Sequence, residues 1–491
     1  MIWRDQSWSW AQLSARVRIA ASGLQSLGVG KGDRILVHAR NSNALIETMW
    51  ASWMIGAVWV PTNFRLTPPE VAYLAQSSGA VAHIFESSFP DHARAALDGN
   101  PACRVSIDIG AEWEALATGD TALGEAVDVD RDDPAWFFYT SGTTGRPKAA
   151  ILTHGQMAFV VTNHLCDLMP GTTERDACLV VAPLSHGAGI HALTQVARGA
   201  VSILMSGEKL DCAEAFELIE RHRVTNLFTV PTILTMLTRH EAVDLHDHSS
   251  LRYVIYAGAP MYRADQVFAL EKLGPVLVQY FGLGEVTGNI TVLPPHLHSA
   301  VEDPAFPIGS CGYPRTGMEI AILDPEGVRQ PPDATGEICV RGPAVFSGYH
   351  DNMAATAKAF AHGWFHTGDL GHLDRRGFLY ITGRQSDMYI SGGSNVYPRE
   401  IEEALLTHPA IAEACVLGLP HPKWGESGVA VLVLAAEVAD TALLAHLDGR
   451  LARYKWPARF VRWDELPKSG YGKVEKREVA RRLIDSGLRM D

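Results

Sequence analysis

Hydrophobic and polar residues follow two alternating periods along the first half of the chain. In 11–27, apolar residues such as Leu13, Val17 and Leu24 recur at the spacing of one helix face, whereas 33–38 is a short apolar run typical of a buried strand. The same alternation predicts helices at 45–55, 68–75 and 213–222 and strands at 57–61, 81–85, 202–205 and 226–231. This order predicts doubly wound layers of α/β structure.

The pattern changes in the second half of the chain. Gly and Pro become frequent over 305–381, and short strands are predicted at 319–323, 336–341 and 378–382, which together indicate a small β-rich subdomain. A compact α+β pattern follows Gly383-Arg384. We therefore expect a large multi-layer N-terminal domain, 1–384, with two doubly wound α/β subdomains and the β-rich part, and a small mobile α+β C-terminal domain, 385–491.

Composition fits an ordinary soluble protein with more than one domain, since 491 residues are 47% hydrophobic and 20% charged. No apolar run approaches the roughly 20 residues that span a bilayer, and the longest, 429–436, is predicted to be a buried strand. The start of the chain lacks the features of a signal peptide. The seven cysteines are scattered without a C-x-x-C pair, so we expect reduced thiols, no zinc site and a cytoplasmic protein. The net charge of −13 argues against nucleic acid as a partner.

The densest candidate chemistry is Tyr139-Thr-Ser-Gly-Thr-Thr-Gly-Arg-Pro-Lys148. It follows a predicted strand, 135–139, and ligands of α/β sheets bind where strands end. The glycines let backbone N–H groups converge on an anion, the hydroxyls add donors, and Arg146 and Lys148 add positive charge. The spacing does not fit a Walker A motif. We favour a phosphate-binding loop over the alternative, a polar surface loop between strands.

Four further segments follow in order: Ala257-Gly-Ala-Pro260 with Gln279-Tyr-Phe-Gly-Leu-Gly-Glu285, Trp364-Phe-His-Thr-Gly-Asp369, Gly383 to Glu402, and Leu466-Pro-Lys-Ser-Gly-Tyr-Gly-Lys473. With the loop at 139–148, they resemble the AMP-forming acyl-CoA synthetases, relatives of luciferases and of nonribosomal adenylation domains. The resemblance covers essentially the full chain and rests on the order of the five motifs. It implies a carboxylate–CoA ligase that converts ATP, acid and CoA to acyl-CoA, AMP and pyrophosphate through an acyl-adenylate.

The resemblance also implies roles for individual residues. Glu285 would coordinate Mg²⁺, and Lys473 would bridge the substrate carboxylate and the nucleotide during adenylation. The residues implied in ATP binding are Thr140, Ser141, Gly142, Thr143, Thr144, Gly145 and Lys148 at the phosphates, Gly258, Ala259, Pro260, Phe281 and Gly282 around adenine, and Asp369 and Arg384 at the ribose and phosphate region. At two positions the chain departs from the family: Gly284 replaces the usual Thr or Ser, and Ser386 replaces an Asp or Lys at the hinge between the domains.

The acid and CoA would occupy neighbouring positions. The implied acyl pocket contains His186, Gly187, Tyr256, Gly282 and Gly288, and the implied CoA contacts are Gly392, Gly393, Trp424 and Lys455. The predicted pocket walls, 186–192, 256–258 and 281–289, are rich in small and apolar residues, which favours an aromatic or a short- to medium-chain acid. They contain no Arg or Lys, which argues against a dicarboxylic acid.

Two other functions remain open at this point. A stand-alone adenylation enzyme would load a carrier protein instead of CoA, but the Asp that would bind an amino acid is absent after Pro183-Leu-Ser-His186. A non-catalytic nucleotide-binding protein is disfavoured by Lys473, Glu285 and Asp369. The expected partners are a small carboxylic acid, ATP and CoA, and both a monomer and a homodimer are compatible with the sequence.

Overall fold

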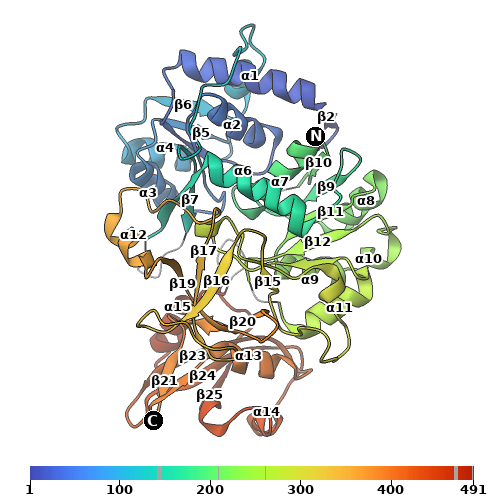
Figure 1. The fold of residues 1–491 in the computed structure, drawn as a ribbon, viewed down its shortest axis with the longest axis vertical. Helices are drawn as coiled ribbons and strands as arrows, with labels where there is room; N and C mark the ends of the chain where they lie inside the picture. Colours follow the sequence, from blue (N-terminus) through green and yellow to red (C-terminus); the bar gives the residue numbers. More distant parts are fainter. Residues whose placement is uncertain (141–145, 208, 260, 469–473, 489, 491) are drawn as a thin grey trace.

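The computed structural model describes residues 1–140, 146–207, 209–259, 261–468, 474–488 and 490 (Figure 1). The chain begins in two large sheets. The six-stranded sheet has the order β6-β5-β3-β4-β7-β8, and all neighbours are parallel except β7 and β8. Its strands are β3 (Arg34–His38), β4 (Val58–Pro61), β5 (Ala82–Phe85), β6 (Val105–Asp108), β7 (Pro134–Thr140) and β8 (Lys148–Thr153).

The seven-stranded sheet has the order β13-β12-β11-β9-β10-β1-β2, and only β1 and β2 pair antiparallel. Its strands are β1 (Ile2–Trp3), β2 (Gln6–Ser7), β9 (Ala177–Val180), β10 (Val201–Leu204), β11 (Asn226–Thr229), β12 (Tyr253–Tyr256) and β13 (Leu277–Gln279). Parallel neighbours require crossover connections, and here helices supply them.

The helices that cover these sheets begin and end at recognisable signals. For example, Ser9 and Gln12 form a capping box at the start of the first helix, and Gly79 ends the third helix with a left-handed conformation. The helices are α1 (Trp10–Ser26), α2 (Asn43–Met54), α3 (Pro68–Ser78), α4 (Pro90–Gly99), α5 (Ala111–Ala117), α6 (His154–Asn163), the π-helix η1 (His164–Leu168), α7 (Gly187–Arg198), α8 (Cys212–His222), α9 (Pro231–Arg239), α10 (Ala242–Leu245) and α11 (Arg263–Leu273). None of the helices in the described ranges is both apolar and long enough to span a bilayer.

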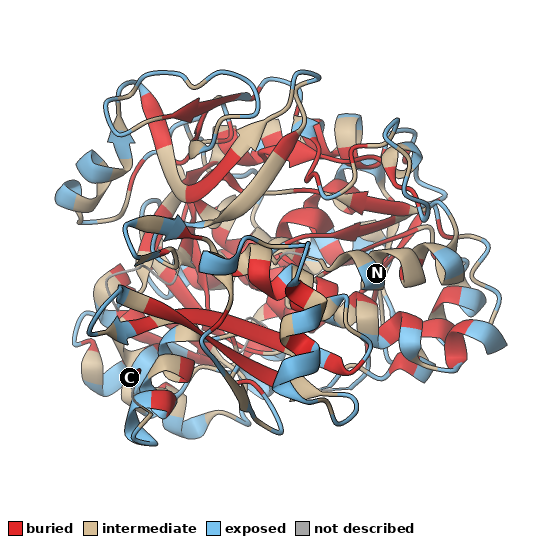
Figure 2. Ribbon diagram, turned by 90° about the horizontal axis from the view of Figure 1, so that it is seen from below, coloured by how far each residue is buried: buried red, intermediate tan, exposed pale blue. Residues whose placement is uncertain are grey.

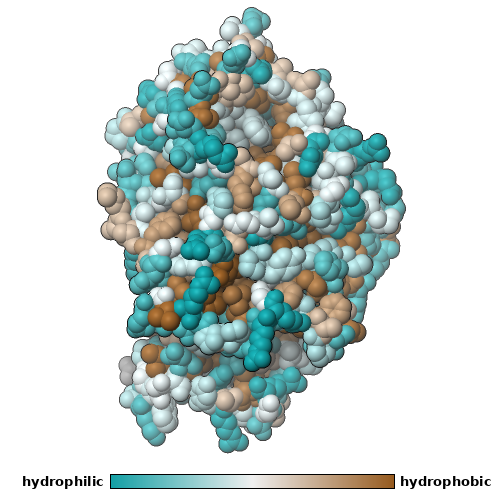
Figure 3. All heavy atoms as spheres, viewed as in Figure 1, coloured by the Kyte–Doolittle hydropathy of each residue, from teal (hydrophilic) through white to brown (hydrophobic). Residues whose placement is uncertain are grey.

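The main core joins the two sheets. It contains Trp59 and Trp136 of the six-stranded sheet, whose rings meet edge to face at 4.6 Å, together with Val180 and Leu204 of the seven-stranded sheet. Buried residues follow the strands, and exposed ones follow the outer helices and loops (Figure 2). Hydrophilic residues cover much of the outer face in Figure 3. The doubly wound layers expected from the sequence are therefore present.

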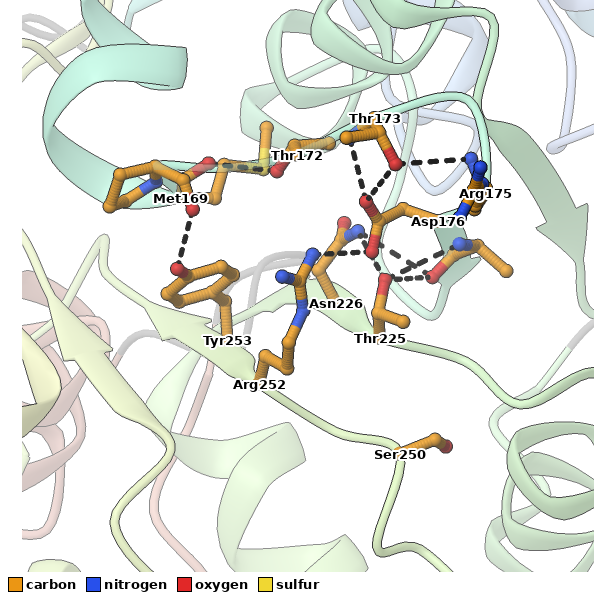
Figure 4. A network of polar contacts seen from close by, with 12 residues as sticks. Met169, Thr172, Thr173, Arg175, Asp176, Thr225, Asn226, Ser250, Arg252 and Tyr253 are labelled. Atoms are coloured by element: carbon orange, nitrogen blue, oxygen red, sulfur yellow. Dashed lines mark hydrogen bonds and ion pairs between the residues drawn. The ribbon is translucent and has the colours of Figure 1, made fainter.

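A polar network fixes the amino ends of the strands in the seven-stranded sheet (Figure 4). The Asp176 carboxylate accepts hydrogen bonds from the Thr173 amide (2.7 Å) and from the Arg252 guanidinium. The Thr225 hydroxyl donates to the Ala177 carbonyl (3.2 Å), which ties β11 to β9. These contacts lie at the edge opposite to the carboxyl ends of the strands, where ligands of such sheets bind.

The β-rich part contains an antiparallel sheet of order β16-β17-β19-β18, with β20 paired to β19, and a separate pair, β14 and β15. Its elements are the 3₁₀ helices η2 (Gly284–Val286) and η3 (Pro295–Leu297), β14 (Thr291–Val292), β15 (Tyr313–Pro314), β16 (Glu319–Leu323), β17 (Gly336–Arg341), α12 (Met353–Ala359), β18 (Phe360–Ala361), β19 (Trp364–Leu373) and β20 (Leu379–Arg384). Strands β16 and β17 have the predicted bounds.

The last strands form a separate sheet of order β22-β21-β24-β23, with β25 paired to β24. It is drawn in orange and red in Figure 1. The elements are β21 (Tyr389–Ser391), β22 (Ser394–Val396), α13 (Pro398–Leu406), β23 (Ile411–His421), β24 (Gly425–Leu434), α14 (Asp440–Leu447), the 3₁₀ helix η4 (Arg453–Lys455), β25 (Arg459–Arg462) and α15 (Lys476–Asp485). The buried strand predicted at 429–436 overlaps the second half of β24, which ends at Leu434.

Candidate active site

Glu285 lies at the centre of the candidate site. It belongs to η2, and its buried carboxylate accepts two hydrogen bonds at Oε1, from the Thr140 hydroxyl (2.8 Å) and from the Tyr349 hydroxyl (3.0 Å). Burial, followed by the charge of Glu285, raises the pKa of Tyr349, so the phenol remains a proton donor. Three separate segments therefore converge on one carboxylate.

This carboxylate has the environment that a magnesium ligand needs. Two hydroxyl groups donate to it, and one of them belongs to Thr140, which lies within the predicted phosphate loop. Mg²⁺ is often held by one or two protein carboxylates together with phosphate oxygens and water. Glu285 therefore fits Mg²⁺ beside a nucleotide.

The described residues at the two ends of the predicted phosphate loop are close together. Thr140 and Lys148 are paired in the antiparallel ladder of β7 and β8, so the loop joins two strands. The Lys148 ammonium lies 5.1 Å from the centroid of the Tyr349 ring, and the Arg146 guanidinium lies 5.3 Å from that of Tyr73. The predicted site residues Ser141, Gly142, Thr143, Thr144, Gly145, Pro260 and Lys473 lie outside the described part of the chain.

Packing explains why Gly284 replaces the family's Thr or Ser. A Cβ atom at residue 284 would lie 2.5 Å from the Phe138 ring and 2.8 Å from the Thr140 methyl group. Both distances are far below van der Waals contact, so a side chain would require Phe138 to move. The Thr140 hydroxyl, on the same residue, donates to the Glu285 carboxylate.

The residues predicted around adenine follow β12 and β13. Gly258 is exposed after β12, with Ala259 next to it, and the Phe281 amide donates to the Thr291 hydroxyl (3.0 Å). Gly282 lies directly against Gly288, because a Cβ at residue 282 would be 2.2 Å from the Gly288 carbonyl carbon. The structure thus brings the backbone at Gly282, before η2, into contact with the backbone at Gly288, after η2.

Asp369 and Arg384, the predicted ribose contacts, are neighbours across β19 and β20. The Arg384 guanidinium donates from Nε to Oδ1 of the buried Asp369 carboxylate (3.0 Å). The guanidinium itself is half exposed. A carboxylate and a cation thus lie side by side where β19 and β20 pair.

Glu337 supports this pair and was missed by the sequence analysis. Its carboxylate accepts a hydrogen bond from the Gly368 amide (3.0 Å) and another from Nδ1–H of His366 (2.8 Å). Gly368 directly precedes Asp369 in the chain, so the first bond holds the backbone next to the predicted ribose contact. Cys339 Sγ lies 3.4 Å from the same His366 nitrogen, and one ligand atom from each of the three side chains falls within 4.8 Å of the others. Side chains alternate along a strand, so the predicted strand 336–341 already placed Glu337 and Cys339 on one face.

The predicted pocket residues His186 and Gly187 stand at the start of α7. The His186 ring lies 4.7 Å from the Phe138 ring, between centroids, and a Cβ at Gly187 would be 2.7 Å from Phe228. Phe228 in turn is stacked on Tyr280, with centroids 5.9 Å apart, and Gly288 lies against Tyr280. Phe228 and Tyr280, which we call the aromatic pair, therefore lie between Gly187 and Gly288.

Tyr256 does not join this group, which corrects the prediction from the sequence. Its ring is fully buried in the core on the other face of the seven-stranded sheet, and its hydroxyl accepts a hydrogen bond from the Gln266 amide (2.9 Å). Ile255, the preceding residue, packs with the aromatic pair instead. The reason is the alternation of side chains along β12, which turns only every second residue towards the pocket.

Two of the predicted CoA contacts meet in the structure. Gly392 and Gly393 form the turn between β21 and β22 with φ angles of +57° and +83°, which only glycine adopts without strain. The Gly392 amide donates to the Trp424 carbonyl (2.9 Å), and the Trp424 side chain is 46% exposed. Lys455 is engaged elsewhere, since its ammonium donates to both carboxylate oxygens of Glu400 (2.7 Å each).

Ser386, the predicted hinge, lies between β20 and β21, which belong to different sheets. Its exposed hydroxyl donates to the Asp387 carboxylate (3.0 Å). Lys476 stands 3.9 Å from the same carboxylate and 2.9 Å from that of Glu402. A short polar segment thus links the two parts of the chain.

The family model of the AMP-binding enzymes matches residues 1–350, and that of the C-terminal domain of AMP-binding enzymes matches residues 400–473. The chain belongs to the AMP-binding enzymes. Among curated relatives of this family, it is 38% identical to a feruloyl-CoA synthase of Amycolatopsis, over 97% of this chain and 94% of the relative. It is 34% identical to an indoleacetate–CoA ligase of Aromatoleum aromaticum, over 98% and 94%.

Solved structures of AMP-binding enzymes have the same fold. The o-succinylbenzoate CoA synthetase of Bacillus subtilis, in complex with its acyl-adenylate, superposes with a TM-score of 0.86 at 32% identity, over 97% of this chain and 94% of the other. ATP-bound MatB of Rhodopseudomonas palustris gives 0.88 at 29% identity, over 98% and 94%. These enzymes combine a large N-terminal with a small C-terminal domain, which confirms the predicted fold class.

This AMP-binding enzyme is therefore an AMP-forming acid–thiol ligase. The resemblance seen in the five motifs is confirmed, as is the predicted reaction class, an acid–CoA ligase that works through an acyl-adenylate. ATP, CoA and a carboxylic acid are its substrates.

Proposed function

We propose that this ligase activates an aromatic carboxylic acid and transfers it to CoA at the site around Glu285. The observation that carries the proposal is the buried Glu285 carboxylate, held by Thr140 and Tyr349 next to the loop predicted to bind phosphate. The aromatic pair between Gly187 and Gly288 supports an aromatic acid, because flat rings pack favourably on rings. Several relatives are also named for aromatic acids, among them ferulate, indoleacetate and 2-succinylbenzoate.

The first half-reaction joins two anions. The substrate carboxylate attacks the α-phosphorus of ATP, the bond to the β-phosphate oxygen breaks, and pyrophosphate leaves with the electron pair. Lys148 and Arg146 would bind the phosphates, and Lys473 would neutralise the attacking carboxylate, because fixed cations lower an electrostatic barrier. When bound at Glu285, Mg²⁺ would supply charge neutralisation on the phosphates.

The nucleotide would be oriented by Asp369 and Arg384. We propose that the Asp369 carboxylate accepts hydrogen bonds from the ribose hydroxyls, while Arg384 reaches the phosphate region. Their own ion pair, at 3.0 Å, would hold both side chains ready for this role. Glu337, which accepts the Gly368 amide, would act as a positioning residue for Asp369.

In the second half-reaction the CoA thiol attacks the acyl carbonyl and AMP leaves. We propose that the C-terminal domain, 385–491, turns about Ser386 between the two steps and brings Gly392, Gly393 and Trp424 to the site. Lys455 is proposed as a more distant CoA contact, which would require its ion pair with Glu400 to open. All seven cysteines are free thiols, which supports a proposed cytoplasmic location.

The test is a panel of acids with ATP, Mg²⁺ and CoA, in which AMP release is measured with and without CoA. We expect turnover to depend on CoA and to be fastest with arylalkenoic or arylacetic acids, and slow with hexanoate. Glu285→Gln should lower kcat/KM roughly 100-fold or more, whereas Glu302→Gln, at an exposed ion pair, is the matched control. Turnover confined to aliphatic acids would contradict the aromatic assignment, and AMP release only with a carrier protein would contradict the role of CoA.

A further inference from the structure

Arg315 is a buried cation with incomplete hydrogen bonding. Its side chain is 1% exposed; it follows β15, and its amide donates to the Ile290 carbonyl (3.0 Å). Nη2 donates to Nδ1 of His164 (3.0 Å), whereas Nε and Nη1 have no hydrogen-bond partner in the described part of the chain. Leaving donors of a charged group unpaired inside a protein is costly, so such a group calls for a partner.

No charge in direct contact balances this guanidinium within the described ranges. A guanidinium only donates, so a bond to Nδ1 requires a neutral His164 with its proton on Nε2. The same nitrogen lies 3.1 Å from the Val160 carbonyl, to which it would donate in the other tautomer. The Asp167 carboxylate is already occupied by the Thr316 amide (2.7 Å) and the Thr316 hydroxyl (2.9 Å). Burial accordingly lowers the pKa of Arg315 to about 9.

Arg315 stands next to the aromatic pair. Its guanidinium carbon lies 5.9 Å from the centroid of the Tyr280 ring, which is stacked on Phe228. Phe228 lies against Gly187 and Tyr280 against Gly288, so contacts lead from the predicted acyl pocket to the guanidinium. The negative face of the tyrosine ring is favourable for a nearby cation but uses none of its N–H groups.

Near Arg315 and the aromatic pair lie further buried polar atoms that have no hydrogen-bond partner among the described residues. The His164 ring lies 6.4 Å from the His191 ring, which lies 6.3 Å from Phe228. His191 Nδ1 and Gln195 Oε1, both fully or nearly buried on α7, also have no hydrogen-bond partner among the described residues. Buried polar atoms in native proteins are nearly always paired, so several orphans around one aromatic pair indicate a polar group that arrives with a ligand.

We propose that Arg315 binds an oxygen acceptor at the end of the substrate acid that is remote from the reacting carboxylate, so that the preferred acid is an aromatic acid with a distal phenol or carboxylate. This inference rests on the proposed function. It goes against the expectation from the sequence, which disfavoured a dicarboxylic acid because the expected pocket walls contain no Arg or Lys. Arg315 escaped because it comes from a segment 26 positions beyond the last of those stretches, which ended at residue 289.

The experiment compares three acids of one shape: cinnamate, 4-hydroxycinnamate and 4-carboxycinnamate. kcat/KM for AMP release is measured with the wild-type enzyme and with the variants Arg315→Met, Arg315→Lys and Arg315→Gln. Arg175→Met is the matched control, since that side chain is 90% exposed. Circular dichroism and thermal unfolding identify the variants that fold. The preference of the wild-type enzyme among the three acids tests the inference even if no Arg315 variant folds.

We expect the wild-type enzyme to prefer at least one substituted acid over cinnamate. Arg315→Met should lower kcat/KM for that acid roughly 10-fold or more and change that for cinnamate less than about 3-fold, because only the substituted acid loses a bond to a charged donor. The acid with the larger selective loss identifies phenol or carboxylate as the acceptor. Arg315→Lys should retain more of the preference than Arg315→Gln.

Three results would overturn the inference: a wild-type enzyme that prefers cinnamate, equal losses for all three acids, or no loss with any. Equal losses would assign Arg315 a purely structural role. Failure of every acid in the wider panel to release AMP would instead refute the proposed function, so the two failures can be told apart.

Discussion

Residue 284 illustrates how one position can depart from its family and still leave the site intact. The space of a side chain there is filled by the Phe138 ring and the Thr140 methyl group. The hydroxyl of Thr140 meanwhile bonds Glu285. The sequence revealed the missing hydroxyl, whereas the close approach of Phe138 and Thr140 to residue 284 required knowledge of which strand end faces η2.

This packing predicts the effect of restoring the family residue. Gly284→Ser should lower the free energy of unfolding by about 1–3 kcal/mol, because the new atoms overlap the Phe138 ring. Urea unfolding measures the change. In the double variant Gly284→Ser with Phe138→Leu, the loss should be smaller than the sum of the single losses; simple additivity would mean that the two residues do not compete for this space.

His83 predicts a loss of stability in mild acid. It is buried in β5, neither ring nitrogen has a hydrogen-bond partner in the described part of the chain, and burial lowers its pKa to about 4. The unfolded chain takes up the proton below about pH 6.5, and the folded protein does so only near the lowered value, so stability is complete above pH 6.5 and falls as the pH falls. Between pH 7 and pH 5 this residue should cost about 2 kcal/mol.

The measurement is urea unfolding at both pH values. The variant His83→Leu should lose less stability between pH 7 and pH 5 than the wild-type protein does. His296→Gln, at an exposed position, is the control and should follow the wild-type curve. A pH dependence that His83→Leu leaves unchanged would assign the acid sensitivity to other groups.

At the scale of elements, each helix and strand that periodicity predicted in the large domain is present to within a few residues, but α4 to α7 and α9 to α12 were not predicted. Strands 319–323 and 336–341 match β16 and β17, and the helix expected at 213–222 is α8, Cys212–His222. The sequence did not predict pairing, such as the bulge between β17 and β19 that brings Glu337 to the amide of Gly368. Pairing depends on contacts between distant segments, on which local periodicity carries no information. The same limit hid Arg315, whereas the position of Tyr256 on the other face of the sheet follows from the local alternation of side chains along β12.

The contact between β17 and β19 predicts a role for Glu337 in nucleotide binding. In Glu337→Gln, the N–H groups of His366 and Gly368 face either an amide NH₂ group, which cannot accept, or a neutral and therefore weaker acceptor. The backbone at Gly368 and Asp369 should therefore be held less firmly. KM for ATP should rise roughly 10-fold while KM for the acid changes little. Glu319→Gln on the adjacent strand β16, at an exposed ion pair with Arg341, is the matched control. Equal rises in both KM values would show a general disturbance of the fold.

At the scale of the whole molecule, the change in composition near residue 384 coincides with a change of sheet. β20 ends at Arg384 and pairs with β19, whereas β21 starts at Tyr389 in the C-terminal sheet. The short connection between them contains Ser386, whose hydroxyl donates to the carboxylate of its neighbour Asp387. A segment with few long-range bonds is suited to the backbone rotation that we propose between the half-reactions.

Alternation between two domain positions predicts that Lys473 serves one half-reaction only. Lys473→Ala should slow formation of the acyl-adenylate roughly 100-fold or more, because the cation between two anions is lost. Formation of acyl-CoA from supplied acyl-adenylate should be nearly unchanged, since Lys473 would have left the site by then. Lys468→Ala is the control from the same segment, where Lys468 pairs with Glu413 at 2.7 Å. If Lys473→Ala slowed both half-reactions equally, one fixed arrangement of the domains would have to perform both steps.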